Sequence, residues 1–176
     1  GQKIGSGHVM RSLALAMKLR EKSEVLFATD FGGKIIEKNG FKTIKPSQVP
    51  FADIIVTDLR FPKQSELNEL RKKATVMASI DDYAPNVFFQ SDFLINGNVF
   101  APQNNYKTSG KLLLGPKYLT LRKEFCQKEK KISKDANKIL VCTGGADVTN
   151  LTPRIIKALN QVGKKLSVTV AVCPAF

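Results

Sequence analysis

Short, almost entirely apolar segments alternate with helical segments along this chain. Residues 52–58 and 75–80 carry few polar side chains, while residues 63–73 between them are polar, as is typical of a surface helix. A strand that is apolar on both faces needs cover on both, which a parallel sheet between layers of helices provides. The pattern therefore predicts the α/β class. The predicted strands are 25–28, 52–58, 75–80 and 92–96, and the predicted helices are 8–20, 34–39, ended by Gly40, and 63–73.

The same order of elements returns near the end of the chain. Residues 138–142 predict a strand, 143–147 a glycine turn, 151–162 a helix and 166–172 another strand. Thr149 or Asn150 is expected to cap the helix, and Pro153 suits its first turn.

Two Rossmann-like domains follow from this order, 1–131 and 138–176. The lysine-rich stretch 128–138 is the expected linker, and 97–110 is expected to be an irregular connection. Because one strand–helix–strand unit cannot enclose a core, we expect the second domain to be truncated or to rest on the first. The turn at 5–7 normally follows a strand, so we expect the first strand to precede Gly1.

Composition narrows the class of partner. No apolar run reaches the roughly 20 residues that span a bilayer and no leader is visible, so we expect a cytoplasmic protein.

The net charge of +13 favours polyanions, but the lysines are spread out and lack interleaved aromatic residues, which disfavours nucleic acid. Cys126, Cys142 and Cys173 have no metal-ligand spacing, and we expect them to be buried, reduced thiols. No metal or cofactor is predicted.

The run Gly5-Ser6-Gly7-His8 places the only histidine of the chain at the start of a helix. Glycines lack a Cβ and let a ligand approach, while the first N–H groups of a helix attract anions such as phosphate. Histidine exchanges protons near neutral pH, so His8 is a candidate general base. A histidine at this position can also simply bond to the backbone. The run completes neither a P-loop nor a dinucleotide fingerprint.

Acidic and amide residues follow three of the predicted strands. Asp58, Asp81 with Asp82, and Asn96 all fall at carboxyl ends, where open α/β sheets bind their ligands. Each of them can instead cap a helix or form a turn. The sequence thus predicts that they gather at one edge of the sheet.

Three ordered motifs give the chain a specific resemblance. They are Gly5-Ser6-Gly7-His8-Val9-Met10-Arg11, residues 114–125 (LGPKYLTLRKEF) and residues 144–152 (GGADVTNLT). Together they resemble the nucleotide-sugar hydrolases of pseudaminic acid biosynthesis, a family that includes spore-coat polysaccharide biosynthesis proteins. The resemblance implies two domains of the GT-B (MurG-like) type, with UDP held mainly by the second and the sugar facing the first.

The resemblance also implies the roles of individual residues. His8 takes the catalytic position and activates a water that attacks the anomeric carbon of a UDP-linked sugar, with inversion. No cofactor is implied. The substrate- or diphosphate-binding residues expected on this basis are Gly5, Ser6, Gly7, Arg11, Asp58, Asp82, Asn96, Tyr118, Arg122, Gly144, Gly145, Asp147 and Asn150.

The chain departs from the family pattern at one motif, and three alternative functions remain open. The family carries Asp-His-Tyr where this chain has Asp58-Leu59-Arg60, so the sugar is not defined. An acetyltransferase would explain Gln2, Gly5 and Gly7 as a coenzyme A loop, but the parallel units that follow disfavour it. The second alternative is a glycosyltransferase of the same fold. The third is a non-catalytic binder of nucleotide sugars or polyanions.

Overall fold

The computed structural model describes residues 7–125, 134, 136–144, 147 and 149–172. The chain divides into two compact units, and each is described by itself. The sheet unit is His8–Cys126, and the second unit is Gln127–Phe176 together with Gly1–Gly7.

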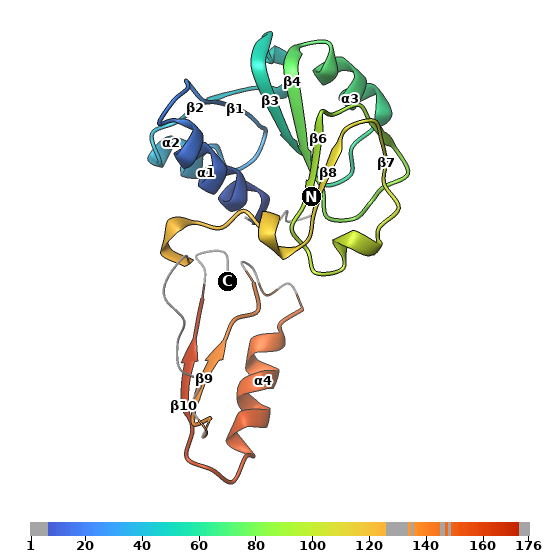
Figure 1. Ribbon diagram of the computed structural model, residues 1–176. Coiled ribbons are helices and arrows are strands. Elements are labelled where there is room, and N and C mark those ends of the chain that lie inside the picture. Colours follow the sequence, from blue (N-terminus) through green and yellow to red (C-terminus); the bar gives the residue numbers. More distant parts are fainter. Residues whose placement is uncertain (1–6, 126–133, 135, 145–146, 148, 173–176) are drawn as a thin grey trace. The chain divides into compact units, whose positions relative to one another are not determined.

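A four-stranded parallel sheet forms the centre of the sheet unit (Figure 1). Its strands are β3 (Ala52–Asp58), β4 (Ala74–Ile80), β6 (Phe93–Asn96) and β8 (Lys111–Leu114), in the order β3-β4-β6-β8. Asp58 pairs with Ile80, and Ile80 pairs in turn with Ile95. The carboxyl ends of these strands are therefore level, which brings the polar residues that follow them to one edge. The parallel α/β class is confirmed.

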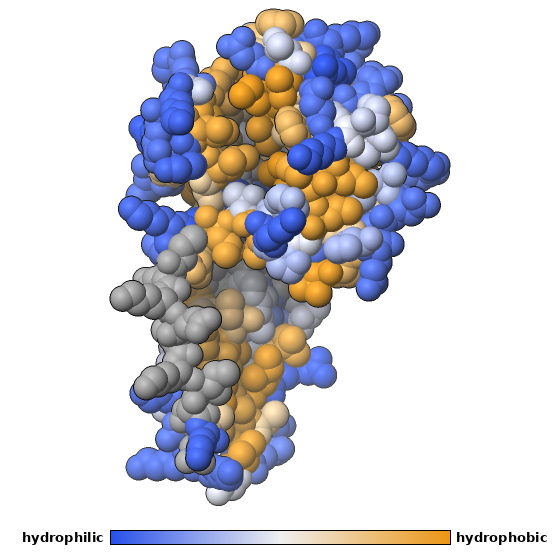
Figure 2. Space-filling view, viewed as in Figure 1, coloured by the Kyte–Doolittle hydropathy of each residue, from blue (hydrophilic) through white to orange (hydrophobic). Residues whose placement is uncertain are grey.

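The core of this sheet lies between helix α3 (Gln64–Arg71) and one sheet face. Leu67 of α3 is 1% exposed and packs with Met77, Phe89 and Leu94. The prediction that helices cover both faces of every strand is wrong for β3. Ile54 is 53% exposed and Val56 is 36% exposed, so the described residues leave one face of β3 partly uncovered. On the face drawn in Figure 2, exposed apolar residues (orange) lie between hydrophilic residues (blue).

A second parallel pair, β1 (Leu26–Ala28) and β2 (Lys42–Ile44), packs with helices α1 (Gly7–Leu19) and α2 (Gly33–Lys38). Its core is Leu13, Ala16, Ile36 and Phe41. Gly40 has φ +79°, a left-handed conformation that ends α2 as expected. β2 was not predicted from the sequence, since it is three residues long and begins with a lysine.

The connection 97–110, expected to be irregular, contains ordered elements. They are the 3₁₀ helix η2 (Ala101–Gln103) and the short strand β7 (Lys107–Thr108), which pairs with β5 (Phe88–Phe89). The rest of the connection is irregular, as expected, and a two-residue strand leaves no periodic pattern in a sequence. The remaining 3₁₀ helices are η1 (Pro46–Gln48), η3 (Pro116–Tyr118) and η4 (Lys123–Phe125).

The second unit contains β9 (Lys138–Val141), helix α4 (Leu151–Asn160) and β10 (Ser167–Val170), with β9 and β10 parallel. The predicted cap of α4 is wrong. Asn150 has φ +50° and its side chain caps nothing, whereas the Asp147 carboxylate accepts the N–H groups of Leu151 (2.8 Å) and Thr152 (2.9 Å). The left-handed backbone at Asn150 turns the chain so that Asp147 reaches the helix start instead.

The expectations for the cysteines and for the linker can be compared with the structure only in part. Cys142 is exposed and not buried, because it comes one residue after the end of β9. Cys126, Cys173 and most of the expected linker lie outside the described residues. Among the described helices, none combines the length and the apolar character needed to cross a membrane.

Candidate functional site

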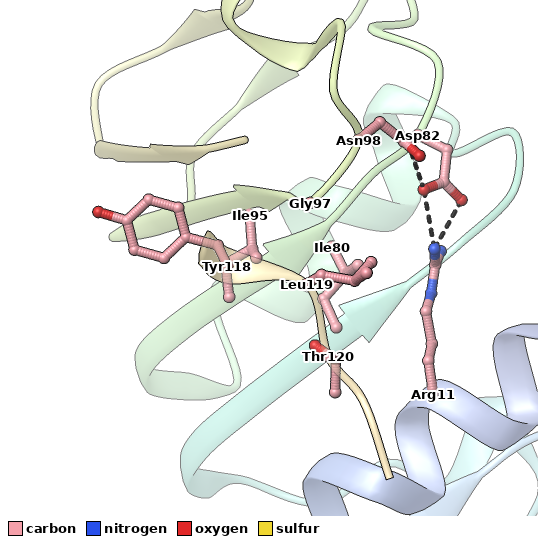
Figure 3. A pocket seen from close by; sticks show the side chains of 9 residues that line it. All are labelled: Arg11, Ile80, Asp82, Ile95, Gly97, Asn98, Tyr118, Leu119 and Thr120. Atoms are coloured by element: carbon pink, nitrogen blue, oxygen red, sulfur yellow. Dashed lines mark hydrogen bonds and ion pairs between the residues drawn. The ribbon is translucent and has the colours of Figure 1, made fainter. Parts of the chain in front are cut away.

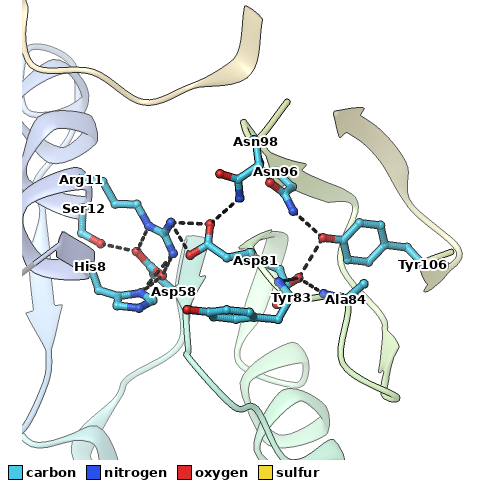
Figure 4. Close-up of polar contacts among 11 residues, drawn as sticks. His8, Arg11, Ser12, Asp58, Asp81, Tyr83, Ala84, Asn96, Asn98 and Tyr106 are labelled. Atoms are coloured by element: carbon cyan, nitrogen blue, oxygen red, sulfur yellow. Dashed lines mark hydrogen bonds and ion pairs between the residues drawn. The ribbon is translucent and has the colours of Figure 1, made fainter. Parts of the chain in front are cut away.

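His8 and Asp58 form a side-chain pair at the carboxyl edge of the sheet (Figure 4). The distance from His8 Nδ1 to Asp58 Oδ1 is 2.7 Å. His8 comes from the first turn of α1, and Asp58 is the last residue of β3. The Asp58 side chain is 8% exposed and the His8 side chain 24% exposed. A nearly buried carboxylate therefore holds an imidazole that solvent can reach.

The neighbours of His8 Nδ1 decide which ring nitrogen carries the proton. Arg11 Nη2 lies 3.0 Å from Nδ1, but this guanidinium group already donates to Asp58 Oδ1. A carboxylate only accepts, and Asp58 is closer to Nδ1 than Arg11 is. We therefore assign the proton to Nδ1, which donates it to Asp58. The lone pair of neutral His8 is then on Nε2, where it can accept a proton.

Arg11 links helix α1 to the ends of two strands. Its Nε donates to Asp58 Oδ2 (2.6 Å), and its Nη1 donates to both oxygens of Asp82 (2.8 and 2.7 Å). Ser12 Oγ also donates to Asp58 Oδ2 (3.2 Å). Residues three and four positions apart share one helix face, so His8, Arg11 and Ser12 all point toward Asp58. Burial lowers the pKa of Arg11, but the hydrogen bonds and charges of Asp58 and Asp82 outweigh this and raise it, which keeps Arg11 positive.

A buried polar network lies beside this cluster and holds the loop after β4. Asp81 is 2% exposed, and its Oδ2 accepts from the Tyr106 hydroxyl (2.8 Å) and from the backbone N–H groups of Tyr83 (2.8 Å) and Ala84 (2.7 Å). Asn96 donates to the Tyr106 hydroxyl (2.7 Å) and is 0% exposed. Asn96 was predicted to bind substrate. In the structure its side chain is buried and supports the edge of the sheet from inside.

Tyr106 provides a measurable test of this network. Burial and the charge of Asp81 raise the pKa of Tyr106 to about 12. The hydrogen bonds with Asn96 and Asn104 act in the opposite direction but are outweighed. Since an unfolded tyrosine ionises near pH 10, the stabilisation is complete below about pH 10 and is lost as the pH rises to about 12. We expect near-ultraviolet titration to show a late-ionising tyrosine that is absent in Tyr106→Phe.

Tyr118→Phe is the matched control and should keep the late step. Tyr106→Phe should also lower the free energy of unfolding by about 1–2 kcal/mol, because Asp81 loses a hydrogen bond in a buried site. Ionisation of all the tyrosines together near pH 10, in a chain still folded by circular dichroism, would contradict the network.

The structure brings together four predicted site residues, His8, Arg11, Asp58 and Asp82. Tyr118 lines a pocket considered below, and the Arg122 guanidinium lies 5.0 Å from the centre of the Phe125 ring. Gly144 has φ +86°, and Gly7 begins α1. Gly5, Ser6 and Gly145 are outside the described residues.

Asp147 and Asn150 lie at the start of α4. Burial raises the pKa of Asp147, but the N–H groups of Thr152 and Leu151 outweigh this and lower it. The Asp147 carboxylate therefore occupies two backbone donors that an anionic ligand at this helix would use.

Sequence reasoning missed Ser12 and Tyr106, and it singled out Asn98 only as part of the run 94–98 that resembles positions of the hydrolase family. Ser12 could have been found, because it lies four residues after His8 on the same face of the helix. Asn98 and Tyr106 lie in the connection after β6, where no periodic pattern marks them. Asn98 Nδ2 donates to Asp82 Oδ1 at 3.2 Å, which extends the cluster to the end of β6.

The fold and the cluster define an α/β protein with parallel sheets, consistent with a Rossmann-like fold, and with a histidine–aspartate pair at the carboxyl edge. Its sequence is 24% identical to the UDP-2,4-diacetamido-2,4,6-trideoxy-beta-L-altropyranose hydrolase of Campylobacter jejuni over 174 residues, covering 89% of this chain and 61% of the relative. The chain is thus a distant homologue of a UDP-sugar hydrolase.

A second relative is protein MJ1062 of Methanocaldococcus jannaschii, described as uncharacterized. It is 30% identical over 198 residues, which cover 98% of this chain and 41% of the relative. The chain therefore spans between two fifths and about three fifths of the length of these relatives. No protein-family model matches the chain, and no solved structure gives a significant match.

Proposed function

We propose that the protein is a nucleotide-sugar hydrolase that releases UDP and a free diacetamido-trideoxy sugar in pseudaminic-type acid or surface polysaccharide biosynthesis. The observation that carries the proposal is the bond between His8 Nδ1 and Asp58, which leaves Nε2 to accept a proton. The distant relationship to a UDP-sugar hydrolase supports the choice of substrate.

In the proposed reaction, His8 Nε2 removes a proton from water as the water oxygen bonds to the anomeric carbon. The bond from that carbon to the diphosphate oxygen breaks, and its electron pair leaves with UDP. Attack from the opposite side inverts the configuration. A nucleoside diphosphate is a good leaving group, so the reaction needs less acid assistance than hydrolysis by paired carboxylates.

The cluster of His8, Arg11, Asp58 and Asp82 is arranged to balance the positive charge of the imidazolium that forms in the proposed reaction. Two carboxylates, Asp58 and Asp82, and one guanidinium, Arg11, give a net charge of −1 when His8 is neutral. The cluster becomes neutral when His8 takes the proton of water, and Asp58 stabilises the imidazolium directly. An anionic diphosphate gains nothing from an arginine that two carboxylates already hold. Arg11, Asp58 and Asp82 are therefore proposed to serve the water and the sugar.

The test is a product assay with the full-length native polypeptide. Incubation with UDP-2,4-diacetamido-2,4,6-trideoxy-β-L-altropyranose in ¹⁸O-labelled water should yield equal amounts of UDP and free sugar. The label should enter the anomeric hydroxyl and not UDP, and NMR should show the inverted anomer first. Sugar release that requires an added acceptor would indicate a glycosyltransferase. Turnover of acetyl-coenzyme A would indicate an acetyltransferase, and binding without turnover a non-catalytic binder.

A further inference from the structure

A small pocket lies beside the Arg11–Asp82 ion pair, within the sheet unit (Figure 3). Its volume is about 70 Å³. Gly97, just after β6, makes the pocket possible, because a Cβ at this position would lie 2.6 Å from the Leu119 Cα. The close approach of the two backbones places Leu119 and Thr120 against the ends of β4 and β6. The shape of the pocket therefore depends on the absence of a side chain at Gly97.

The walls of the pocket combine three aliphatic side chains with a few polar groups. Ile80, Ile95 and Leu119 form the apolar part, and Asn98 and Thr120 contribute polar atoms. Arg11 and Asp82 also line the pocket, but they neutralise each other in a 2.7 Å ion pair. The pocket thus has no spare charge to attract a phosphate or a carboxylate.

The orientation of the Asn98 amide is fixed by its neighbour. Nδ2 donates to Asp82 Oδ1 at 3.2 Å, because a carboxylate can only accept. Oδ1 is consequently the acceptor, and among the described residues no donor to it is found. An uncharged ligand with an N–H group would complete this hydrogen bond.

Size limits the ligand to a substituent. The volume of about 70 Å³ is several times the space that one water needs, roughly 10–15 Å³. It is far below the roughly 300–1,000 Å³ of pockets that enclose a whole small-molecule ligand. The pocket therefore fits a group of a few non-hydrogen atoms and leaves the sugar ring outside.

We infer that this pocket binds an acetamido substituent of the sugar, with Asn98 Oδ1 accepting its N–H group. The acetyl methyl packs against Ile80, Ile95 and Leu119, and the Thr120 hydroxyl donates to the carbonyl oxygen. Arg11 touches both the pocket and Asp58, so a sugar anchored here lies beside His8. The inference rests on the proposed function, and it makes Asn98 a specificity-determining residue.

The test compares UDP-N-acetylglucosamine with UDP-glucose, which differ by an acetamido group in place of a hydroxyl. In the full-length native polypeptide, kcat/KM should be at least about tenfold higher for the acetylated sugar. Asn98→Ala should reduce this preference about tenfold, because one hydrogen bond to the substituent is lost. Asn86→Ala, an exposed asparagine bonded to Lys107, is the matched control and should keep the preference.

Saturation-transfer NMR supplies a second measurement that requires no turnover. The acetyl methyl protons of UDP-N-acetylglucosamine should receive saturation from the wild-type protein and much less from Asn98→Ala. Equal kcat/KM for the two sugars, or an unchanged preference in Asn98→Ala, would overturn the subsite and leave the hydrolase standing. If neither sugar is hydrolysed, the methyl signal alone decides, and its absence in the wild type overturns the subsite.

Discussion

Replacing His8 with glutamine is expected to reduce kcat for UDP-sugar hydrolysis by about 10²- to 10⁴-fold, the usual contribution of a general base. Glutamine keeps a polar side chain at the start of α1 but cannot take a proton from water. KM should change little, since the imidazole is proposed to act on the water and not to hold the diphosphate. Steady-state release of UDP, measured for both proteins at saturating substrate, checks the expectation.

Lys18→Gln is the control, because Lys18 lies on the same helix with a side chain 76% exposed and pairs only with Glu21 among the described residues. It should keep the wild-type kcat. Lys18→Gln should keep the wild-type melting temperature. His8→Gln should stay folded, since His8 lies outside the core of α1, which is Leu13 and Ala16, and Asp58 keeps its hydrogen bonds from Arg11 and Ser12. A His8→Gln protein with undiminished kcat would remove His8 from the mechanism.

The parts of the fold that the sequence predicted are those with a local hydrophobic signal. The predicted strand 52–58 coincides with β3, and 138–142 differs from β9 by one residue. Both segments are short runs of mostly apolar residues, a pattern that can be recognised within the segment itself. The short strands β2, β5 and β7 have two or three residues each and depend on pairing with other segments. Their formation is decided by tertiary contacts that a local pattern does not contain.

The candidate site was predictable only as a location. Asp58 and Asp82 could be placed at the sheet edge because carboxyl ends of parallel strands meet there. The pairing of Asp58 with His8 joins residues 50 positions apart and depends on how α1 packs against β3. The buried position of Asn96 was equally hidden, since the side chains of a strand alternate between faces and the register decides which face is enclosed.

Replacing Asp58 with asparagine is expected to lower kcat by about 10²- to 10⁴-fold and to change the tautomer of His8. Arg11 donates to both oxygens of Asp58, and an amide has only one oxygen to offer. The amide should therefore turn its oxygen to Arg11 and its NH₂ group to Nδ1, which moves the imidazole proton to Nε2. His8 is the only histidine, so ¹⁵N-histidine NMR gives a single imidazole whose two nitrogen signals identify the tautomer.

Asp53→Asn, at an exposed position in the same strand, is the matched control and should leave both kcat and the imidazole spectrum unchanged. The tautomer is read without substrate, so it tests the His8–Asp58 pair even if the sugar has been misidentified. A wild-type spectrum with the proton on Nε2 would contradict the assignment on which the general base depends. A tautomer that shifts in Asp58→Asn while kcat holds would confirm the pair and refute its catalytic role.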